Sequence, residues 1–388
     1  MNSPDRGDRV EGEDRMTADA RYTGRVEQVP PELEIPPLWC PIDPRIHPDV
    51  GVVGDRIGPW AAGLGFGQRS LLRGTASHAA DWACRVAPDG QRDRLQWMAD
   101  WTYWAFITDD QFTDSGPTMD KPHEWNPFIC QMLAYGADPE TRSETLDVNP
   151  FALGFRDLVT RLESLAPHRL PEWISDHYVW LLGSACSVSD RSAGRTRDLA
   201  EQLVIGPLDR AEALTTLFIE IVEGTQLPLS ERRRPAVRAV TQAAQLLHCF
   251  YNDLASYRHE LRQNSPESNF VHIIQTERRC HPQDAMVMAV RFLDRVMMLF
   301  VTLRDQLRHT GRPELCRYLD QLSHKIRGNS DYQIQVPRYT TTLDIDIDTP
   351  QGIQRATSPI YEYSDQPSDA RLVPPAAAIS WWWDQIDH

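Results

Sequence analysis

Three carboxylates are grouped at the end of an aromatic, apolar stretch of the sequence. The segment WTYWAFITDDQFTDSGPT carries Asp109, Asp110 and Asp114, and on a helix the last two lie one turn apart on the same face. Carboxylates held this close at the end of a buried wall repel one another unless a cation lies among them. Hard divalent cations prefer such oxygen ligands, so the segment is a candidate metal site. The alternative is a solvated helix end followed by a turn, where acidic clusters are common.

A second stretch, FYNDLASYRHE, places oxygen donors of different kinds along one face of a helix. Asn252, Ser256 and Glu260 follow one another at four-residue spacing, so an amide, a hydroxyl and a carboxylate form one stripe. Together they offer oxygen ligands for a divalent ion. The preceding stretch, VTQAAQLLHCFY, is apolar, and a polar stripe that enters a core helix is costly unless it is ligated or paired. The alternative is the exposed C-terminal half of an ordinary long helix.

Both stretches lie in a part of the chain where the hydrophobic pattern is helical. From about residue 68 to residue 336, apolar residues recur at spacings of three and four, and strand-like alternation is rare. The clearest helical segments are ASHAADWACRVA, DRLQWMADWTYWAFI, EALTTLFIEIVEG, VRAVTQAAQLLHCFYNDLASYRHEL and QDAMVMAVRFLDRVMMLFVTLRDQL. The sequence therefore predicts an all-α fold, and the metal hypothesis requires its helices to bring the two motifs together.

The N-terminal part of the chain differs from this helical region. Residues 1–28 are acidic, with few aliphatic or aromatic residues, and are predicted to be disordered. Residues 29–60 are rich in proline and are predicted to cover the folded body in an extended form, with Leu38 and Trp39 as anchors. The helical domain is expected to occupy residues 61–340.

The C-terminal tail, residues 341–388, is expected to be partly disordered. Its stretch TTLDIDIDT (341–349) has the best strand-like alternation in the chain. The tail also carries three consecutive tryptophans, Trp381 to Trp383. Three such side chains could cap a cavity or dock on a partner, but docking onto the protein's own surface is the expectation.

Composition argues against several classes of function. The chain has 388 residues and a formal net charge of -15, which disfavours nucleic-acid binding because phosphate backbones select basic faces. The seven cysteines include no CxxC pair, and the histidines and glycines show neither zinc nor nucleotide-binding spacing. There is no apolar signal-peptide core and no apolar run of about 18 residues. We therefore expect a cytoplasmic protein without stable membrane insertion.

On these residues, the sequence resembles the bacterial class I terpene synthases. DDQFTD resembles the aspartate-rich motif of that family, and NDLASYRHE resembles its NSE motif, with His259 where another basic residue is usual. The motifs begin 143 residues apart (252 − 109), which is also typical of the family. RGNSDYQIQVPRY resembles the family's C-terminal segment and ends in the pair Arg338 and Tyr339. The resemblance covers roughly residues 35–340.

The resemblance implies a single helical bundle around a deep apolar cavity, with both motifs at its mouth and three Mg²⁺ ions between them. The residues that it implies as metal ligands are Asp109, Asp110, Asp114, Asn252, Ser256 and Glu260. In the first motif the implied ligand is Asp109, with Asp110 or Asp114 as a possible companion. The residues that it implies for binding the substrate diphosphate are Arg338, Tyr339, Arg258 and His259.

The implied reaction is ionisation of a prenyl diphosphate followed by cyclisation of the carbocation. Metal ions and arginine stabilise the leaving diphosphate, and aromatic faces can stabilise the cation while the cavity excludes water. Aromatic residues in the helices that lead to the two motifs are Trp97, Trp101, Trp104, Phe106 and Phe250. Some are expected to line the cavity, although each one alone is more often an ordinary core residue.

One position departs from the family pattern. The family usually has a diphosphate-sensing arginine about 46 residues before the NSE asparagine, and here that position is Gly206 (252 − 46). Gly206-Pro207 is expected to break a helix, as the family requires. One hypothesis is that Arg210 reaches the diphosphate instead, against the alternative of a surface arginine at a helix start. Altered triggering and loss of catalysis are the other hypotheses.

The resemblance favours farnesyl diphosphate as the substrate. The expected products are a terpene hydrocarbon or alcohol and free diphosphate. Geranylgeranyl, geranyl and bicyclic diterpenyl diphosphates are alternatives, since the sequence does not give the cavity volume. A chain-elongating prenyltransferase is disfavoured because it would need a second aspartate-rich motif in place of NDLASYRHE. A non-catalytic binder of prenyl diphosphates is suggested only by Gly206. The relatives are often homodimers, which makes a homodimer a further expectation.

Overall fold

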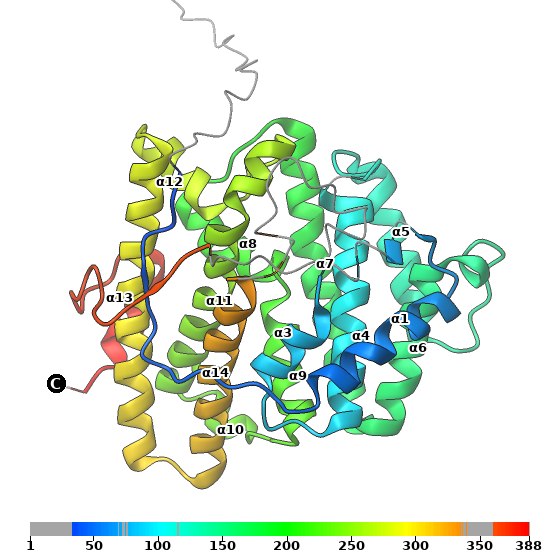
Figure 1. Ribbon diagram of the computed structural model, residues 1–388, viewed down its shortest axis with the longest axis horizontal. Coiled ribbons are helices and arrows are strands. Elements are labelled where there is room, and N and C mark those ends of the chain that lie inside the picture. The colour runs from blue at the N-terminus through cyan, green and yellow to red at the C-terminus, as the bar shows by residue number, and fades with distance from the viewer. Residues whose placement is uncertain are drawn as a thin grey trace, which may run out of the picture.

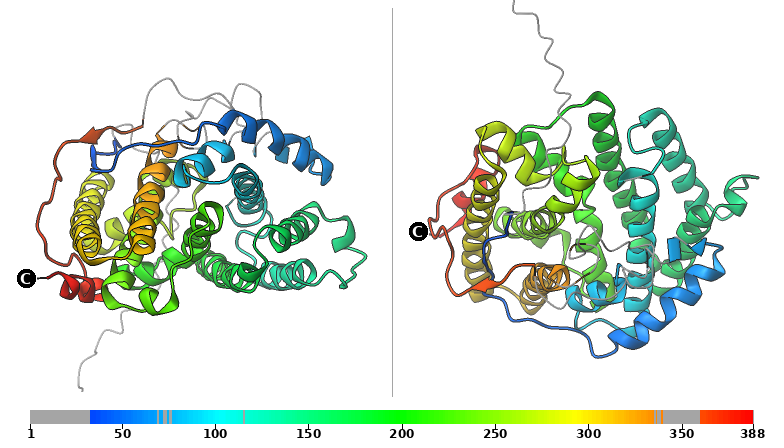
Figure 2. Two further views of the ribbon diagram at one scale, coloured as in Figure 1. Left: turned by 90° about the horizontal axis from the view of Figure 1, so that it is seen from below. Right: turned by 45° about the horizontal axis from the view of Figure 1, so that its top comes forward.

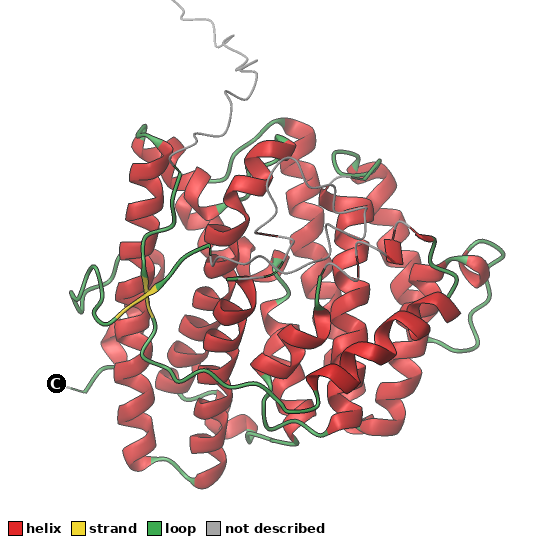
Figure 3. Cartoon of the chain, viewed as in Figure 1, coloured by secondary structure: helices red, strands yellow, loops and turns green. Residues whose placement is uncertain are grey.

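The computed structural model describes residues 33–387 apart from 69, 72–73, 75–76, 115, 335, 337–338 and 340–359. In this part of the chain the regular structure is dominated by helices, which confirms the predicted all-α class (Figure 3). Two short strands, Leu38–Trp39 (β1) and Tyr363–Ser364 (β2), pair in parallel and join the N-terminal and C-terminal parts of the chain. No described helix is long and apolar enough to cross a membrane.

The helices follow one another along the chain and form one bundle (Figure 1). The α-helices are α1 (Val50–Gly63), α3 (Ala79–Val86), α4 (Arg92–Asp109), α5 (Pro122–Ala137), α6 (Pro150–Leu165), α7 (Leu170–Ala193), α8 (Leu199–Asp209), α9 (Glu212–Glu223), α10 (Leu229–Arg232), α11 (Pro235–Gln263), α12 (Phe270–Arg278), α13 (Pro282–Thr310) and α14 (Pro313–Gln333). The other helical turns are the π-helix η1 (Asp110–Asp114) and the 3₁₀ helices η2 (Leu146–Val148), η3 (Pro167–Arg169) and η4 (Ala377–Gln385).

Local sequence signals explain where several of these helices begin. Proline is the first residue of α5, α6, α11, α13 and α14, where its missing N–H costs no helical hydrogen bond. Asp198 caps α8, because its carboxylate accepts from the N–H of Glu201 while the Glu201 side chain accepts from the N–H of Asp198. Asn269 caps α12 by accepting from the N–H of Val271.

Two helices carry the predicted metal motifs, and a third connects them. Helix α11 packs against α8, α9, α12, α13 and α14, whereas α4 packs against α1, α3, α6 and α9. Helix α9 therefore contacts both α4 and α11. Figure 2 shows most of the long helices nearly end-on in its left view, so they run roughly parallel to one another. Burial of the apolar faces of these helices, worth roughly 25 cal/mol per Å², is the main source of cohesion.

The helix break lies four residues later than the sequence suggested. The prediction of a break at Gly206-Pro207 is wrong, since α8 continues through both residues to Asp209. Pro207 stands in the last turn of α8, where its ring removes only one backbone hydrogen bond. The chain turns instead at Ala211, which has a φ of 55°, and α9 begins at the next residue. An alanine in this left-handed conformation is strained by about 1–2 kcal/mol.

The proline-rich segment lies against the bundle, and its last part is helical. Leu38 is buried, and Arg327 of α14 donates a hydrogen bond to the carbonyl of Cys40 at 3.3 Å. Helix α1 begins at Val50 and runs past the predicted boundary at residue 60. The predicted disordered residues 1–28 lie outside the described residues.

The C-terminal residues end in η4, which packs against α11 and α13. Trp382 and Trp383 are buried, and Trp382 Nε1 donates to Gln242 Oε1 of α11 at 3.0 Å. This confirms the expected docking of the three tryptophans on the protein's own surface. The strand candidate TTLDIDIDT, residues 341–349, lies outside the described residues.

Candidate active site

A cavity of about 160 Å³ opens between α3, α4, α7, α9, α11 and α14. A single water molecule needs roughly 10–15 Å³ on the same measure, so the cavity can admit an organic ligand. Its apolar wall includes Trp82, Trp101, Ala105, Phe106, Trp180, Ala211, Cys249 and Tyr332. Its polar side chains include Asp109, Arg210, Glu212, His248, Asn252, Ser256, His259, Glu260 and Tyr339. The cavity thus combines an aromatic interior with the oxygen donors of both motifs.

The first motif contributes Asp109, the last residue of α4, to the cavity. Thr113 orients this residue, because its hydroxyl donates to the Asp109 carboxylate and, at 3.2 Å, to the Asp109 carbonyl. Asp110 begins the π-helix η1 and is not among the residues that line the cavity. The side chain of Asp114 lies outside the described residues. Of the two acids whose side chains the structure describes, Asp109 lines the cavity and Asp110 does not.

The second motif contributes Asn252, Ser256 and Glu260, all from α11, to the same cavity. The Ser256 hydroxyl donates to Glu260 Oε1 at 2.6 Å, so these two donors already lie together. Asn252 Nδ2 donates to the hydroxyl of Tyr339 at 2.8 Å. The amide oxygen is the Asn252 atom that can serve as a metal ligand, because the amide nitrogen only donates hydrogen bonds.

Only some of the residues predicted to contact a diphosphate line the cavity in the part of the chain that the structure describes. Tyr339 and His259 line the cavity, whereas Arg258 is exposed and is not among its lining residues. Arg338 lies outside the described residues. Arg210 lines the cavity and donates to Asp209 Oδ2 at 2.8 Å and to Asp253 Oδ1 at 3.1 Å. The Arg210 side chain is 24% exposed and lies in the wall of the cavity beside both motifs.

The donor set that meets at the cavity fits a hard divalent cation. Asp109 and Glu260 supply carboxylates, Asn252 an amide oxygen and Ser256 a hydroxyl, which are the oxygen ligands that Mg²⁺ accepts. Burial raises the pKa of the neighbouring Asp253, although the Arg210 guanidinium opposes this shift. Arg210 is thus the counter-ion of a fully buried carboxylate next to the donor set.

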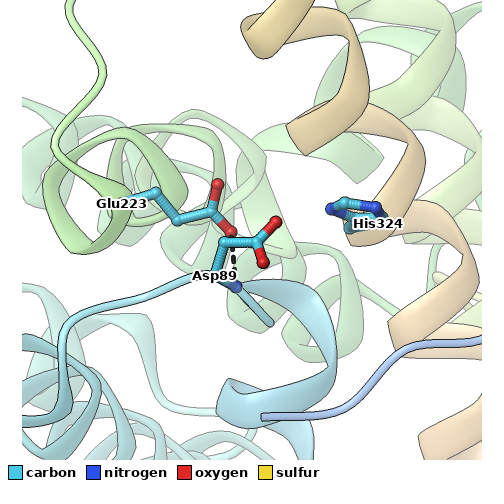
Figure 4. A group of neighbouring side chains, drawn as sticks. All are labelled: Asp89, Glu223 and His324. Carbon is cyan, nitrogen blue, oxygen red and sulfur yellow. Dashed lines mark hydrogen bonds between the residues drawn. The ribbon is translucent and has the colours of Figure 1, made fainter.

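Another group of potential metal ligands lies at the opposite end of α4 (Figure 4). Asp89, Glu223 and His324 point toward one another there. The length of α4 is about 27 Å, and this length separates the group from Asp109 at the other end of the helix. The Arg45 guanidinium donates to both Asp89 oxygens at 2.6 Å, so it already supplies a positive charge. This group therefore does not belong to the candidate active site.

Aromatic residues of the cavity were only partly foreseen. Trp101 and Phe106 line it, whereas Trp97, Trp104 and Phe250 are fully buried and are not among its lining residues. Trp82 of α3 and Trp180 of α7 were not singled out, although both belong to the cavity wall. Their helices approach the site only through tertiary packing, and no spacing to either motif points to them.

Three polar residues near the motifs were also missed. His248 stands one turn before Asn252 on α11, so the four-residue spacing of that stripe could have identified it. Glu212 is the first residue of α9, directly after the helix break. Arg191 of α7 donates to the carbonyl of Met119 at 3.0 Å and lines a smaller cavity together with Asp109, Arg210 and Glu260. No sequence spacing links Arg191 to these residues.

Comparisons with known proteins identify the relatives of this chain. A family model described as "Terpene synthase family 2, C-terminal metal binding" matches residues 100–298, which include the residues of both motifs. The chain is 30% identical over 363 residues to bonnadiene synthase of Allokutzneria albata, covering 91% of this chain and 98% of that protein. It is also 30% identical over 361 residues to (+)-T-muurolol synthase ((2E,6E)-farnesyl diphosphate cyclizing) of Streptomyces clavuligerus, covering 89% of this chain and 81% of that protein.

A solved structure supports the same relationship. The crystal structure of the SVS_A2 protein from ancestral sequence reconstruction superposes with a TM-score of 0.77 at 28% sequence identity. The superposition covers 90% of this chain and 99% of that protein. The similarity therefore extends over most of the chain.

Proposed function

The chain belongs to the bacterial class I terpene synthases, enzymes that cyclise prenyl diphosphates, and we propose that it uses Mg²⁺ to ionise farnesyl diphosphate. One observation supports the assignment of the site most directly. Asp109 at the end of α4 and the stripe Asn252, Ser256 and Glu260 on α11 line one cavity with an aromatic interior. Metal-binding oxygens and an aromatic, water-excluding space are the two things that ionisation and cyclisation need.

The family match implies dependence on a divalent metal, and we assign that role to Mg²⁺. Asp109 would hold ions on one side of the cavity, and Asn252, Ser256 and Glu260 would hold an ion on the other, with three ions in all. The bound ions would neutralise the charge that develops on the leaving diphosphate. Asp110 is a weaker candidate, because Asp109 lines the cavity and Asp110 does not.

Protein groups complete the binding of the diphosphate in this proposal. Arg210 and Tyr339 line the cavity beside the motifs, and His259 stands next to Glu260. We propose that Arg210 takes the place of the sensing arginine that Gly206 cannot supply. Binding of the diphosphate by Arg338 and Arg258 stays a prediction. The guanidinium of an arginine suits phosphate oxygens because it donates several hydrogen bonds in one plane.

The apolar wall would protect and guide the carbocation. The cavity is bordered by four aromatic residues, Trp82, Trp101, Phe106 and Trp180. An aromatic face attracts a cation by roughly 0.5–2 kcal/mol. Each of these rings also displaces water that would otherwise capture the cation. The same wall sets the length and folding of the prenyl chain that fits.

Farnesyl diphosphate is the proposed substrate because the 30% identical relative from Streptomyces clavuligerus is named for cyclising it. Geranylgeranyl diphosphate and geranyl diphosphate are the alternatives to be compared with it. The test is to incubate the purified protein with each diphosphate, with and without Mg²⁺, and to measure diphosphate release and the extracted products by mass spectrometry. Mg²⁺-dependent release with a cyclic product from farnesyl diphosphate supports the proposal. Turnover of geranylgeranyl diphosphate alone would correct the substrate, and no turnover of any diphosphate would overturn the proposed reaction.

Two adjacent carboxylates provide a matched pair of variants for the metal assignment. Asp109→Asn is expected to lower the rate of diphosphate release by more than about 100-fold, beyond the 10–100-fold typical of residues that only support a metal ligand. Asp110→Asn, the same change at the next residue, is expected to lower it by less than about tenfold. Equal losses in the two variants would show that the choice of Asp109 is wrong.

Two further expectations concern the cellular location and the oligomeric state of the protein. All seven cysteines are free, which supports the proposal that the enzyme works in the reducing cytoplasm. The homodimer stays a prediction, and light scattering on the purified protein tests it.

A further inference from the structure

His248 is a buried histidine in the wall of the cavity, and only one of its ring nitrogens is engaged. The residue is 7% exposed, and its ring packs edge-on against Trp82 with 6.0 Å between ring centres. Nδ1 lies 2.6 Å from Glu212 Oε1. Nε2 is buried and has no hydrogen-bond partner in the part of the chain that the structure describes. An unpartnered buried nitrogen costs roughly 1–3 kcal/mol, and this one belongs to a residue that lines the cavity.

Glu212 and Lys325 fix which nitrogen of His248 carries the proton. The other oxygen of Glu212 accepts from Lys325 Nζ at 2.7 Å, and Lys325 is completely buried. Burial alone would raise the pKa of Glu212, but His248 and Lys325 bring it below its ordinary value, so Glu212 is ionised. An ionised carboxylate only accepts hydrogen bonds, so Nδ1 of His248 must be the donor. Nε2 then carries a free electron pair.

The surroundings of His248 keep its ring neutral. Burial lowers the pKa of His248, and the Lys325 ammonium lowers it further, while the Glu212 carboxylate opposes both effects. These two charged groups face the ring from α9 and α14, and the ring of Trp82 of α3 packs against it. A neutral imidazole whose orientation and tautomer are fixed by a carboxylate is the usual arrangement of a general base.

The contrast with His177 shows that not every buried histidine of the bundle keeps a ring nitrogen without a partner. His177 is also buried, but Trp101 Nε1 donates to its Nε2 at 2.9 Å and its Nδ1 lies 2.7 Å from the carbonyl of Trp173. Both nitrogens of His177 are therefore engaged, and the residue does not line the cavity. His248 differs in both respects.

We propose that His248 is the base that ends the reaction, with Glu212 and Lys325 as its positioning pair. The inference rests on the proposed cyclisation in this cavity. A C–H bond next to the cationic carbon breaks, its electron pair becomes the new carbon–carbon double bond, and the proton moves to Nε2 of His248. The resulting imidazolium is stabilised by the Glu212 carboxylate, and it returns the proton to solvent or diphosphate when the products leave.

His248→Phe tests this role because it keeps an aromatic ring against Trp82 and removes the base. Diphosphate release should continue at a reduced rate, since ionisation depends on the metal motifs. The share of the wild-type end product should fall at least tenfold, with products of other deprotonations or of water capture in its place. His324→Phe is the matched control, because His324 Nδ1 is also buried without a partner among the described residues but lies away from the cavity. This control should keep the wild-type product mixture.

A second variant distinguishes a positioning role from a structural one. Glu212→Gln should shift the product mixture in the same direction as His248→Phe, measured at a temperature where circular dichroism shows the variant folded. A loss of stability alone would leave that mixture unchanged. If His248→Phe does not fold, His248→Asn, which is smaller and lacks the imidazole base, replaces it with the same expected result.

The outcomes separate this inference from the proposed function. A wild-type protein that releases no diphosphate from any prenyl substrate overturns the proposed function itself. A wild-type protein that turns over substrate, together with a folded His248 variant that gives the wild-type product mixture, overturns only the role of His248. Diphosphate would then be the base.

Discussion

Arg210 joins the buried Asp253 to the cavity, and at the scale of single residues it has two separable roles. Arg210→Ala would leave the Asp253 carboxylate buried without its ion-pair partner, which is expected to cost about 3–5 kcal/mol in the free energy of unfolding. It should also lower the rate of diphosphate release by at least about tenfold, because a guanidinium beside the diphosphate is lost. Chemical denaturation measures the first effect, and a phosphate-release assay below the melting temperature measures the second.

Arg195→Ala is the control for this prediction. Arg195 also pairs with two carboxylates, Asp190 and Glu201, but its side chain is 46% exposed and does not line the cavity. Its removal should cost less than about 1 kcal/mol and should not change diphosphate release. If Arg210→Ala kept the wild-type release rate while folded, the diphosphate role of Arg210 would have to be abandoned.

Residue spacing predicted the parts of the site that lie on one helix. Asn252, Ser256 and Glu260 share a face of α11 because four-residue spacing fixes that face regardless of tertiary structure. The link between Glu212 and Lys325 could not be predicted, because these residues come from α9 and α14 and meet only after packing. Local patterns carry no information on such a contact.

At the scale of elements, the crossing of α7 and α8 controls the position of the helix break. A Cβ atom on Gly183 of α7 would lie 2.3 Å from the backbone nitrogen of Asp209, at the end of α8. Gly183→Ala should therefore push the two helices apart and cost about 1–3 kcal/mol in the free energy of unfolding. Because Asp209 accepts hydrogen bonds from Arg210 and, at 2.6 Å, from Ser187, the substitution should also slow diphosphate release. Thermal denaturation and the release assay check both effects.

Gly51→Ala provides the matching control in another helix. Gly51 lies in α1, and a Cβ atom there would meet nothing within 4 Å. The substitution should be neutral or stabilise the protein by about 0.5–1 kcal/mol, because alanine loses less backbone entropy than glycine on folding. Equal destabilisation by the two substitutions would contradict the close crossing of α7 and α8.

The same crossing explains why the predicted helix break was wrong. Local preference places a break at Gly206-Pro207, and a proline in mid-helix would justify it. The last turn of α8 is held against α7 at Gly183, however, and packing of this turn keeps it helical to Asp209. Helix type and approximate extent were predictable from periodicity, whereas this boundary depended on a tertiary contact.

At the scale of the whole molecule, a carboxyl group at the end of the bundle opposite the active site is expected to make the stability of the protein depend on pH. Burial raises the pKa of Glu223 from 4.5 to about 7, although Gln321 donates a hydrogen bond to its carboxylate at 2.8 Å. The folded state therefore holds this proton more tightly than the unfolded state, so stability contributed by Glu223 is lost as the pH rises from about 4.5 through about 7.

Glu223→Gln should remove this dependence because it keeps a hydrogen-bonding side chain without a titratable group. At pH 8 the variant should be more stable than the wild type by about 1–2 kcal/mol, a value reduced from the full shift for partial solvent exposure. At pH 5, where the wild-type carboxyl is mostly neutral in the folded state, the two proteins should have similar stability. Denaturant titrations in the presence of a chelator, at both pH values, measure this difference. A variant that is less stable than the wild type at pH 8 would contradict the raised pKa.

The bundle as a whole was predictable from composition and periodicity, but its cavity was not. Apolar residues at helical spacing require helices to pack, and two polar stripes on apolar helices indicate a shared ligand. The wall, by contrast, takes Trp82, Trp101 and Trp180 from three different helices. Their convergence follows from how the helices cross, which no single stretch of sequence encodes.

The most direct test of the account is whether Asp109 and Asn252 act on one shared set of ions. Binding of Mn²⁺, as a paramagnetic substitute for Mg²⁺, is measured by electron paramagnetic resonance in the presence of inorganic diphosphate, for the wild type, Asp109→Asn, Asn252→Leu and the double variant. Each single variant should weaken diphosphate-dependent binding by at least about tenfold. The double variant should lose little more than the worse single variant, because both residues serve the same cluster. Fully additive losses, or wild-type binding that diphosphate does not strengthen, would contradict a shared site.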